Sequence, residues 1–368
     1  LHDALPISKN QPAKILGIKT AQTVWEAKRL CPDLICLPPN FELYQQYSAK
    51  VRDIYLRYTD KVESFGPDEC WLDVTESLSL FGSGEQIANT LREVVKKETG
   101  LTISVGVSWN KYFAKLGSDL KKPDATTVIN RENYQKLIWD LPADVLIFIG
   151  KRTIEKLNKL NIHTIKDLAM ADKDMLVEQF GIMGEKYHDI ALGNNTEDVA
   201  NADVLGKTKS IGNGMTTIRD LTTKDEVETV VLTLSEKITY RMREAGLKGK
   251  TATLSLRDET LHFTSHSQTY PTPTDNAGSL SKMCMEIFDR FWGKTHLKIR
   301  SVRVAVSNLT PADSDSQLSM WETTNEKQRK LNESLDKIRK KYGYYAVRRA
   351  KTLDKDYINY FEVDEEND

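Results

Sequence analysis

The sequence contains few cysteines, and their spacing suits neither a metal site nor a disulfide framework. Its 368 residues include four cysteines, Cys31, Cys36, Cys70 and Cys284, with no Cys-x-x-Cys pair among them. Small secreted scaffolds and zinc ribbons need more cysteines at closer spacing. We therefore expect reduced, buried thiols and an intracellular protein.

Long apolar runs are also missing. No segment approaches the roughly 20 apolar residues that a membrane-spanning helix needs. The first residues show no basic stretch followed by an apolar one, so we expect neither a secretion leader nor a membrane partner. Long internal repeats and low-complexity tracts are absent too, which leaves an ordinary globular protein of two to four compact units.

Charge of one sign is not in excess, since the net charge is −1. Its distribution along the chain is less even. Residues 206–309 carry 16 lysines and arginines against 11 aspartates and glutamates, whereas residues 362–368 are strongly acidic. A segregated basic segment is typical of a surface that binds phosphates, although a solvated surface with random charges has the same composition.

Hydrophobic periodicity predicts alternating helices and strands, and thus an α+β or α/β core. We expect helices over residues 23–30, 41–58, 85–98, 225–245, 280–292 and 325–342. We expect strands over residues 70–74, 101–107, 251–257 and 300–306. Residues 133–193 form helical stripes separated by glycine turns, which predicts a small all-α unit, and the polar stretch that follows is interpreted as a linker.

One pair of adjacent carboxylates, Asp68 and Glu69, stands at the entrance of the strand expected over 70–74. Carboxylate oxygens at such a position suit Mg²⁺, which prefers oxygen ligands and often bridges protein carboxylates and substrate phosphates. A second, ordinary interpretation is a solvated strand end. Asp73 lies five residues after Asp68, and we expect it in the same strand on the opposite face, so we do not count it as a ligand.

The residues around this pair resemble a known family. Residues 64–75 (SFGPDECWLDVT) resemble the catalytic palm motif of the Y-family translesion DNA polymerases. Residues 104–124 contain SVGVSWNK, then AK and KKPD, which resemble the second palm signature, and residues 17–32 resemble the finger segment. Because the motifs are colinear from about residue 9 to residue 349, the chain is identified as a member of this family, most similar to its bacterial DNA polymerase IV type.

The resemblance implies an α+β multidomain fold with a palm sheet and helices, small fingers, an all-α helix-hairpin-helix thumb and an α/β little finger. Its expected segments are partial fingers (9–40), palm (41–130), thumb (131–200), linker (201–208), little finger (209–310), clamp-binding peptide (314–322), and a C-terminal helix with an acidic tail (323–368).

The implied function is template-directed, low-fidelity DNA synthesis in DNA repair and damage tolerance, with two Mg²⁺ ions at the catalytic site. By resemblance, Asp68 and Glu69 are metal ligands, while Lys122 and Lys14 bind the triphosphate of the incoming dNTP. Lys14 stands where the family usually has arginine, whose guanidinium can bind bidentately. Gln11 stands where the family often has tyrosine.

The resemblance also implies primer–template DNA as a partner. The turn at Gly150 and Lys151 resembles a DNA-binding helix-hairpin-helix, although Phe148 replaces the usual first glycine, and a plain helix–helix turn is the alternative. In the little finger we expect phosphate contacts from four basic residues, each of which is otherwise a solvated strand residue: Lys209, Arg257, Arg300 and Arg303. Arg303 stands where family members usually have glycine.

Residues 317–321 (QLSMW) resemble the bacterial sliding-clamp peptide. Gln317 is expected at the rim of the clamp pocket, with Leu318, Met320 and Trp321 inside it. The alternative is that Met320 and Trp321 pack onto the little finger. We expect a monomer that works in the cytoplasm at the nucleoid.

The first residues match no part of the family pattern. Residues 1–8 (LHDALPIS) have no strand or helix periodicity, and we expect a non-native leader in place of the strand that bears another metal-binding aspartate and an aromatic steric gate. A naturally frayed terminus is the alternative. We expect the chain as printed to be nearly inactive. Two other classes are a non-catalytic polymerase-like accessory protein that binds DNA and the clamp, and a nucleotidyl cyclase with a palm-like sheet.

Overall fold

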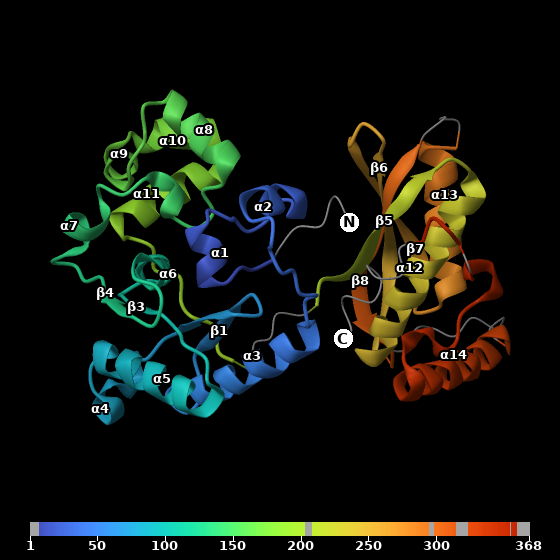
Figure 1. Cartoon of the computed structure of the whole chain (residues 1–368), viewed down its shortest axis with the longest axis horizontal. Coiled ribbons are helices and arrows are strands. Elements are labelled where there is room, and N and C mark those ends of the chain that lie inside the picture. Colours follow the sequence, from blue (N-terminus) through green and yellow to red (C-terminus); the bar gives the residue numbers. More distant parts are fainter. Residues whose placement is uncertain (1–6, 203–207, 294–297, 314–322, 354, 359–368) are drawn as a thin grey trace. The chain divides into compact units, whose positions relative to one another are not determined.

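The computed structural model describes residues 7–202, 208–293, 298–313, 323–353 and 355–358 (Figure 1). These residues fall into two compact units: residues 42–205 form one, and residues from 1–41 and 206–368 form the other. Both units combine helices and strands, as predicted for an α+β fold. Among the described residues, no helix combines the length and the apolar character needed to cross a membrane.

The unit of residues 42–205 contains two small sheets. The antiparallel hairpin pairs β1 (Val62–Phe65) with β2 (Glu69–Leu72), and the parallel pair joins β3 (Val105–Val107) to β4 (Thr126–Val128). The helices that accompany these sheets are α3 (Phe41–Tyr55), α4 (Leu78–Phe81), α5 (Gly84–Thr99) and α6 (Lys111–Leu120). β1 and β4 are short strands that the sequence did not predict.

Helix α5 shows how local sequence specifies an element here. Ser83 and Gln86 form a capping box at its start, and Gly100 ends it with a left-handed backbone conformation. Between them, Ile87, Leu91 and Val95 recur at intervals of four residues and are buried together with Ile54 of α3. The helix predicted over residues 85–98 is confirmed.

The second half of this unit is helical, as predicted for residues 133–193. Its helices gather together in Figure 1 and are α7 (Tyr134–Ile138), α8 (Lys151–Lys159), α9 (Ile165–Met170), α10 (Lys173–Phe180) and α11 (Ile182–Leu192). They share one core with α6, to which Phe113, Leu116 and Leu157 contribute. Gly184 lets α10 and α11 approach closely, because a Cβ there would lie 2.0 Å from the carbonyl oxygen of Leu176.

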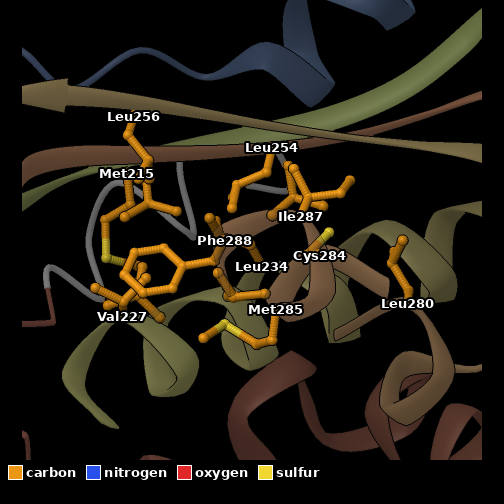
Figure 2. Packing of buried hydrophobic residues seen from close by; sticks show 14 of the residues in the cluster. Met215, Val227, Leu234, Leu254, Leu256, Leu280, Cys284, Met285, Ile287 and Phe288 are labelled. Atoms are coloured by element: carbon orange, nitrogen blue, oxygen red, sulfur yellow. The ribbon is translucent and has the colours of Figure 1, made fainter. Parts of the chain in front are cut away.

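The other unit contains a four-stranded antiparallel sheet in the order β5-β8-β6-β7. The strands are β5 (Ser210–Leu221), β6 (Leu247–Asp258), β7 (Phe263–Thr274) and β8 (Ile299–Pro311). The two helices that cover one face of the sheet are α12 (Lys224–Glu244) and α13 (Ala277–Phe291). Figure 2 shows the interface: Leu254 and Leu256 of the sheet point toward Leu234 of α12 and Phe288 of α13.

The C-terminal segment adds a further layer to this unit. It consists of α14 (Thr323–Tyr342) and two 3₁₀ helices, Tyr344–Ala346 and Ala350–Thr352. Arg339 and Arg349 of this segment both bind the buried Glu236 of α12, at 3.4 and 2.6 Å. The same compact unit includes α1 (Gln11–Ile15) and α2 (Val24–Leu30), which have a small core of their own.

Candidate active site

Asp68 and Glu69 lie where the hairpin of β1 and β2 turns, so their predicted position at a strand entrance is confirmed. Gly66, Pro67 and Asp68 form the turn, and Gly66 has a φ of +82°, a conformation that glycine adopts without strain. Glu69 is the first residue of β2, opposite Phe65. The Asp68 carboxylate is exposed and has no ion pair or hydrogen bond to any residue that the structure describes.

The prediction that Asp73 lies within the second strand is wrong. β2 ends at Leu72, and Asp73 begins a turn in which its Oδ1 accepts hydrogen bonds from the amide of Thr75 at 3.0 Å and from the Thr75 hydroxyl at 2.6 Å. Burial raises the pKa of Asp73. The hydrogen bonds from Thr75 and the charge of Lys61 lower the pKa by more than burial raises it, so the pKa lies below its usual value. Its carboxylate is therefore committed to the turn and to Lys61, 3.6 Å away.

Glu69 and Lys122 are connected by a chain of ion pairs that the sequence analysis did not identify. The ammonium of Lys115 lies 3.0 Å from Oε1 of Glu69 and 2.5 Å from Oδ2 of Asp119. The other oxygen of Asp119 lies 2.8 Å from the ammonium of Lys122. The structure thus brings one candidate metal ligand and one candidate triphosphate-binding lysine into the same network. The i,i+4 spacing of Lys115 and Asp119 was the available signal.

The two lysines of this network are held with different strength. The Lys115 side chain is 14% exposed, and although burial lowers its pKa, hydrogen bonds from its ammonium to Asp119 and Glu69 raise the pKa more. Burial raises the pKa of Asp119, but its bonds to Lys115 and Lys122 produce a net decrease. The Lys122 side chain is 45% exposed. An exposed pair contributes only ~0–1 kcal/mol, so Lys122 can exchange Asp119 for another anion at little cost.

Three contacts hold α6, which carries Lys115 and Asp119, against the strands. Gly106 of β3 meets the backbone of α6 so closely that a Cβ would lie 1.9 Å from the carbonyl oxygen of Ala114. The ammonium of Lys111 pairs with Glu63 of β1 at 2.6 Å. The indole of Trp71 donates a hydrogen bond to the carbonyl of Lys111 at 2.9 Å. The hairpin and α6 are therefore fixed relative to each other.

The turn that follows α6 is held from α5. Arg92 donates to the carboxylate of Asp124 at 2.8 Å and also to its carbonyl oxygen, and Lys96 pairs with the same carboxylate at 3.0 Å. Asp124 has a φ of +50°, which is uncommon for residues other than glycine. These contacts fix the backbone beside Lys122, whose own side chain is 45% exposed.

The donor set at the hairpin fits Mg²⁺. Asp68 and Glu69 provide adjacent carboxylates, and the pair to Lys115 engages Oε1 of Glu69, which leaves Oε2 for a second interaction. Among the described residues, no three or more His, Cys, Asp or Glu side chains are grouped in a way that would hold a metal ion. Two carboxylates would supply only part of a coordination shell, and substrate phosphates and water would have to add the remaining oxygens.

Lys14 and Gln11, the other residues considered for the triphosphate, lie on the short helix α1. Both side chains are exposed. They belong to the unit formed by residues from 1–41 and 206–368, whereas Lys122 belongs to the unit of residues 42–205. The role of Lys14 in nucleotide binding remains a prediction, and Gln11 stands where the family often has tyrosine.

The candidate DNA-binding turn has a left-handed residue where the family pattern has glycine. Phe148 has a φ of +72°, and Gly150 caps α8 with a φ of −87°. Left-handed backbone is strained for phenylalanine. Tyr187 donates a hydrogen bond to the Phe148 carbonyl at 3.2 Å, and the Lys186 ammonium lies 5.2 Å from the Phe148 ring centroid. The chain therefore has a left-handed residue at position 148 without a glycine, and Lys151 is exposed in the first turn of α8. The helix-hairpin-helix assignment stays a prediction.

The basic candidates of the four-stranded sheet differ in their surroundings. Arg303 is exposed on β8, opposite Gly214 and Ser255, on the face away from α12 and α13, since its neighbours Val302 and Val304 are buried on the helix side. Arg257 donates to the carbonyl of Leu261 at 3.1 Å and so supports the hairpin turn. Arg300 lies beside a register shift, 3.7 Å from Asp220, and Lys209 is exposed just before β5.

The same open face of the sheet has a ladder of hydroxyl pairs that the sequence analysis missed. Thr251–Thr269, Thr253–Ser267 and Ser255–Ser265 each pair at 2.8 Å across β6 and β7. The alternation of small hydroxyl residues in both strands was a usable signal. Gln317, Leu318, Met320 and Trp321 lie outside the described residues.

Two protein-family models match this chain. The model of the impB/mucB/samB family matches residues 4–119, and the model of the C-terminal domain of that family matches residues 208–320. A DNA polymerase IV from Acetivibrio thermocellus is 42% identical over 346 residues, which are 94% of this chain and 86% of the relative. DNA polymerase IV 1 from Bacillus subtilis is 30% identical over 94% of this chain and 83% of its own length.

Solved structures share the fold. A Y-family DNA polymerase chimera of Dbh and Dpo4 has a TM-score of 0.73 at 21% identity and covers 84% of this chain and 89% of its own. A ternary complex of Dbh has a TM-score of 0.58 at 22% identity and covers 82% and 88%. The identity to the bacterial relatives, over nearly the whole chain, places this protein in the impB/mucB/samB family, the Y family of DNA-directed DNA polymerases that act in damage tolerance.

Proposed function

We propose that Asp68 and Glu69 hold two Mg²⁺ ions for template-directed nucleotidyl transfer from a dNTP to a primer. The supporting observation is the adjacency of an unengaged carboxylate, Asp68, and a second one, Glu69, that the network of ion pairs joins to Lys122. When bound, the metal ions supply activation of the attacking 3′-oxygen and stabilisation of the leaving pyrophosphate. The protein residues hold those ions and orient the substrate.

The triphosphate is bound by lysine in this proposal. Lys122 leaves Asp119 and contacts the phosphate oxygens, while Lys115 stays between Glu69 and Asp119. The family pattern also assigns Lys14 to the triphosphate, to which an ammonium offers a point charge rather than a bidentate fork. The ammonium groups balance the charge of the triphosphate, which lowers the cost of bringing it next to two carboxylates.

Primer–template DNA is proposed to lie on the open face of the four-stranded sheet and at the α8 turn. Two solved structures that share this fold are ternary complexes of Dbh DNA polymerase. The hydroxyl ladder consists of short side chains that can form hydrogen bonds, and Arg303 adds positive charge to the same face. At the α8 turn, Gly150 and Lys151 present backbone amides and a charge to phosphate.

The remaining assignments follow the family pattern. We propose that residues 317–321 bind the bacterial sliding clamp. Replacing Gln317 and Leu318 with alanine is expected to abolish capture by immobilised clamp, and unchanged capture would disprove the assignment.

We also propose that the protein works on DNA at the nucleoid as a monomer. The proposed segments are residues 9–40 as fingers, 41–130 as palm, 131–200 as thumb and 209–310 as little finger.

Single-nucleotide incorporation tests the catalytic proposal. Because we expect the chain as printed to be nearly inactive, the assay uses an extended chain, in which the family's strand with the other metal-binding aspartate is joined before residue 9. Asp68→Asn is expected to reduce incorporation to background while DNA binding, measured by fluorescence anisotropy, stays unchanged. Asp73→Asn is the matched control, because that carboxylate is engaged by Thr75 and Lys61 and is not proposed as a ligand. Incorporation at the wild-type rate by the Asp68 variant would contradict the proposal. DNA binding without incorporation by the extended chain would indicate an accessory protein instead.

A further inference from the structure

Asp119 lies between Lys115, which contacts the candidate metal ligand Glu69, and Lys122, the candidate triphosphate-binding lysine. It accepts from Lys115 at 2.5 Å on one oxygen and from Lys122 at 2.8 Å on the other. Lys115 is nearly buried and also holds Glu69, so the Asp119 carboxylate keeps its place whether or not Lys122 is bound to it. Lys122 has no other ion pair among the described residues, and its side chain is 45% exposed.

We propose that Asp119 is a resting position for the Lys122 ammonium, from which the incoming triphosphate must displace it, and that Asp119 thereby sets the dNTP affinity of the site. The inference rests on the proposed function, since it takes Lys122 as the lysine that contacts the triphosphate. Asp119 does not touch the substrate in this account and acts as a positioning residue. It competes with the substrate for one cation.

In this geometry Lys122 has one partner in the empty site and another in the occupied site. While the site is empty, Lys122 is kept close to the position where it is needed, instead of sampling solvent. When a triphosphate enters, the ammonium gains a more highly charged partner and loses a single carboxylate. After release of the product, Asp119 is still held by Lys115 and receives Lys122 again. The enzyme therefore binds dNTP more weakly than it would if Asp119 did not compete for Lys122.

Equilibrium binding of dNTP to the enzyme on a primer–template with a dideoxy-terminated primer measures this competition without turnover. Asp119→Asn is expected to lower the dNTP dissociation constant by about two- to fivefold, the range that an exposed ion pair contributes. In steady-state incorporation the KM for dNTP falls by a similar factor. Asp119→Ser provides a second neutral variant, and thermal melting checks that both are folded.

A double-mutant cycle distinguishes competition for Lys122 from a general change in charge. Lys122→Gln alone is expected to weaken dNTP binding, and Asp119→Asn added to it should have no further effect. The control Glu93→Gln removes one exposed negative charge on α5 and should leave dNTP binding unchanged. Tightening by Asp119→Asn that persists in the Lys122→Gln background, or unchanged or weaker binding by Asp119→Asn, overturns the inference. Unchanged binding by Lys122→Gln alone overturns the proposed role of Lys122 itself.

Discussion

Replacing Gly106 with alanine tests whether the contact between β3 and α6 builds the active site. The added Cβ would lie 1.9 Å from the Ala114 carbonyl oxygen and 2.6 Å from the Ser118 amide nitrogen. Ordinary contact begins at 3.4 Å, so α6 has to move by about 1.5 Å. Overpacking against helix backbone costs ~1–3 kcal/mol, because backbone cannot yield as a flexible side chain does.

The same movement separates Lys115 from Glu69, which are 3.0 Å apart. We therefore expect a loss of about 1–3 kcal/mol in the free energy of unfolding, measured by urea titration, together with a slower rate of nucleotide incorporation at temperatures where the variant is folded. Gly117→Ala is the milder control on the same interface, since its nearest contact is the Gly106 Cα at 3.1 Å. Wild-type stability in the Gly106 variant, or a larger loss in the Gly117 variant, would refute the reasoning.

Three further predictions concern stability and reactivity. Arg339→Met leaves the buried Glu236 short of a partner and should cost about 3 kcal/mol in chemical unfolding, and a change within error would contradict the buried contact. Glu226 is a second case: burial raises its pKa, but hydrogen bonds from Thr222, Arg219 and Thr223 lower it to about 2, below the unfolded value, so its stabilisation is present above pH ~4.5 and is lost as the pH falls toward 2. Glu226→Gln should remove this part of the acid slope, and an unchanged slope would be evidence against it. Burial raises the pKa of Cys284 to about 12, so a thiol reagent should label the exposed Cys36 first and Cys284 only on unfolding, whereas equal rates would disprove its burial.

Elements with local signals could be predicted from the sequence. Helices α5, α12 and α13 each begin at a side-chain cap, Ser83, Thr223 and Asn276, and each has an apolar face at helical spacing. The adjacency of Asp68 and Glu69 needs no tertiary information either. These features depend on residues a few positions apart.

Strands β5 and β7 could not be predicted in the same way. β5 contains Gly212 and Gly214, and β7 alternates small hydroxyl residues with polar ones, so neither shows a strong apolar pattern. β5 is stabilised by pairing with β8, which is distant in the sequence, and β7 by pairing with β6 and by the hydroxyl ladder. Asp73 was placed wrongly because parity was applied beyond the end of β2, where Thr75 turns the chain.

The ion-pair network also depends on tertiary structure. Lys115 and Asp119 are visible as an i,i+4 pair, but the contact of Lys115 with Glu69 depends on the close approach of α6 to the strands at Gly106. A contact across 46 residues of sequence leaves no local pattern.

The central claim is that Asp68 and Glu69 hold divalent cations beside an incoming triphosphate, and binding of Mn²⁺ tests it most directly. Electron paramagnetic resonance counts free and bound Mn²⁺ in the complex with dideoxy-terminated primer–template and dNTP, so no turnover is needed. The account predicts that Asp68→Asn weakens Mn²⁺ binding strongly while Asp73→Asn leaves it unchanged. Equal Mn²⁺ affinity in the wild type and the Asp68 variant would contradict it.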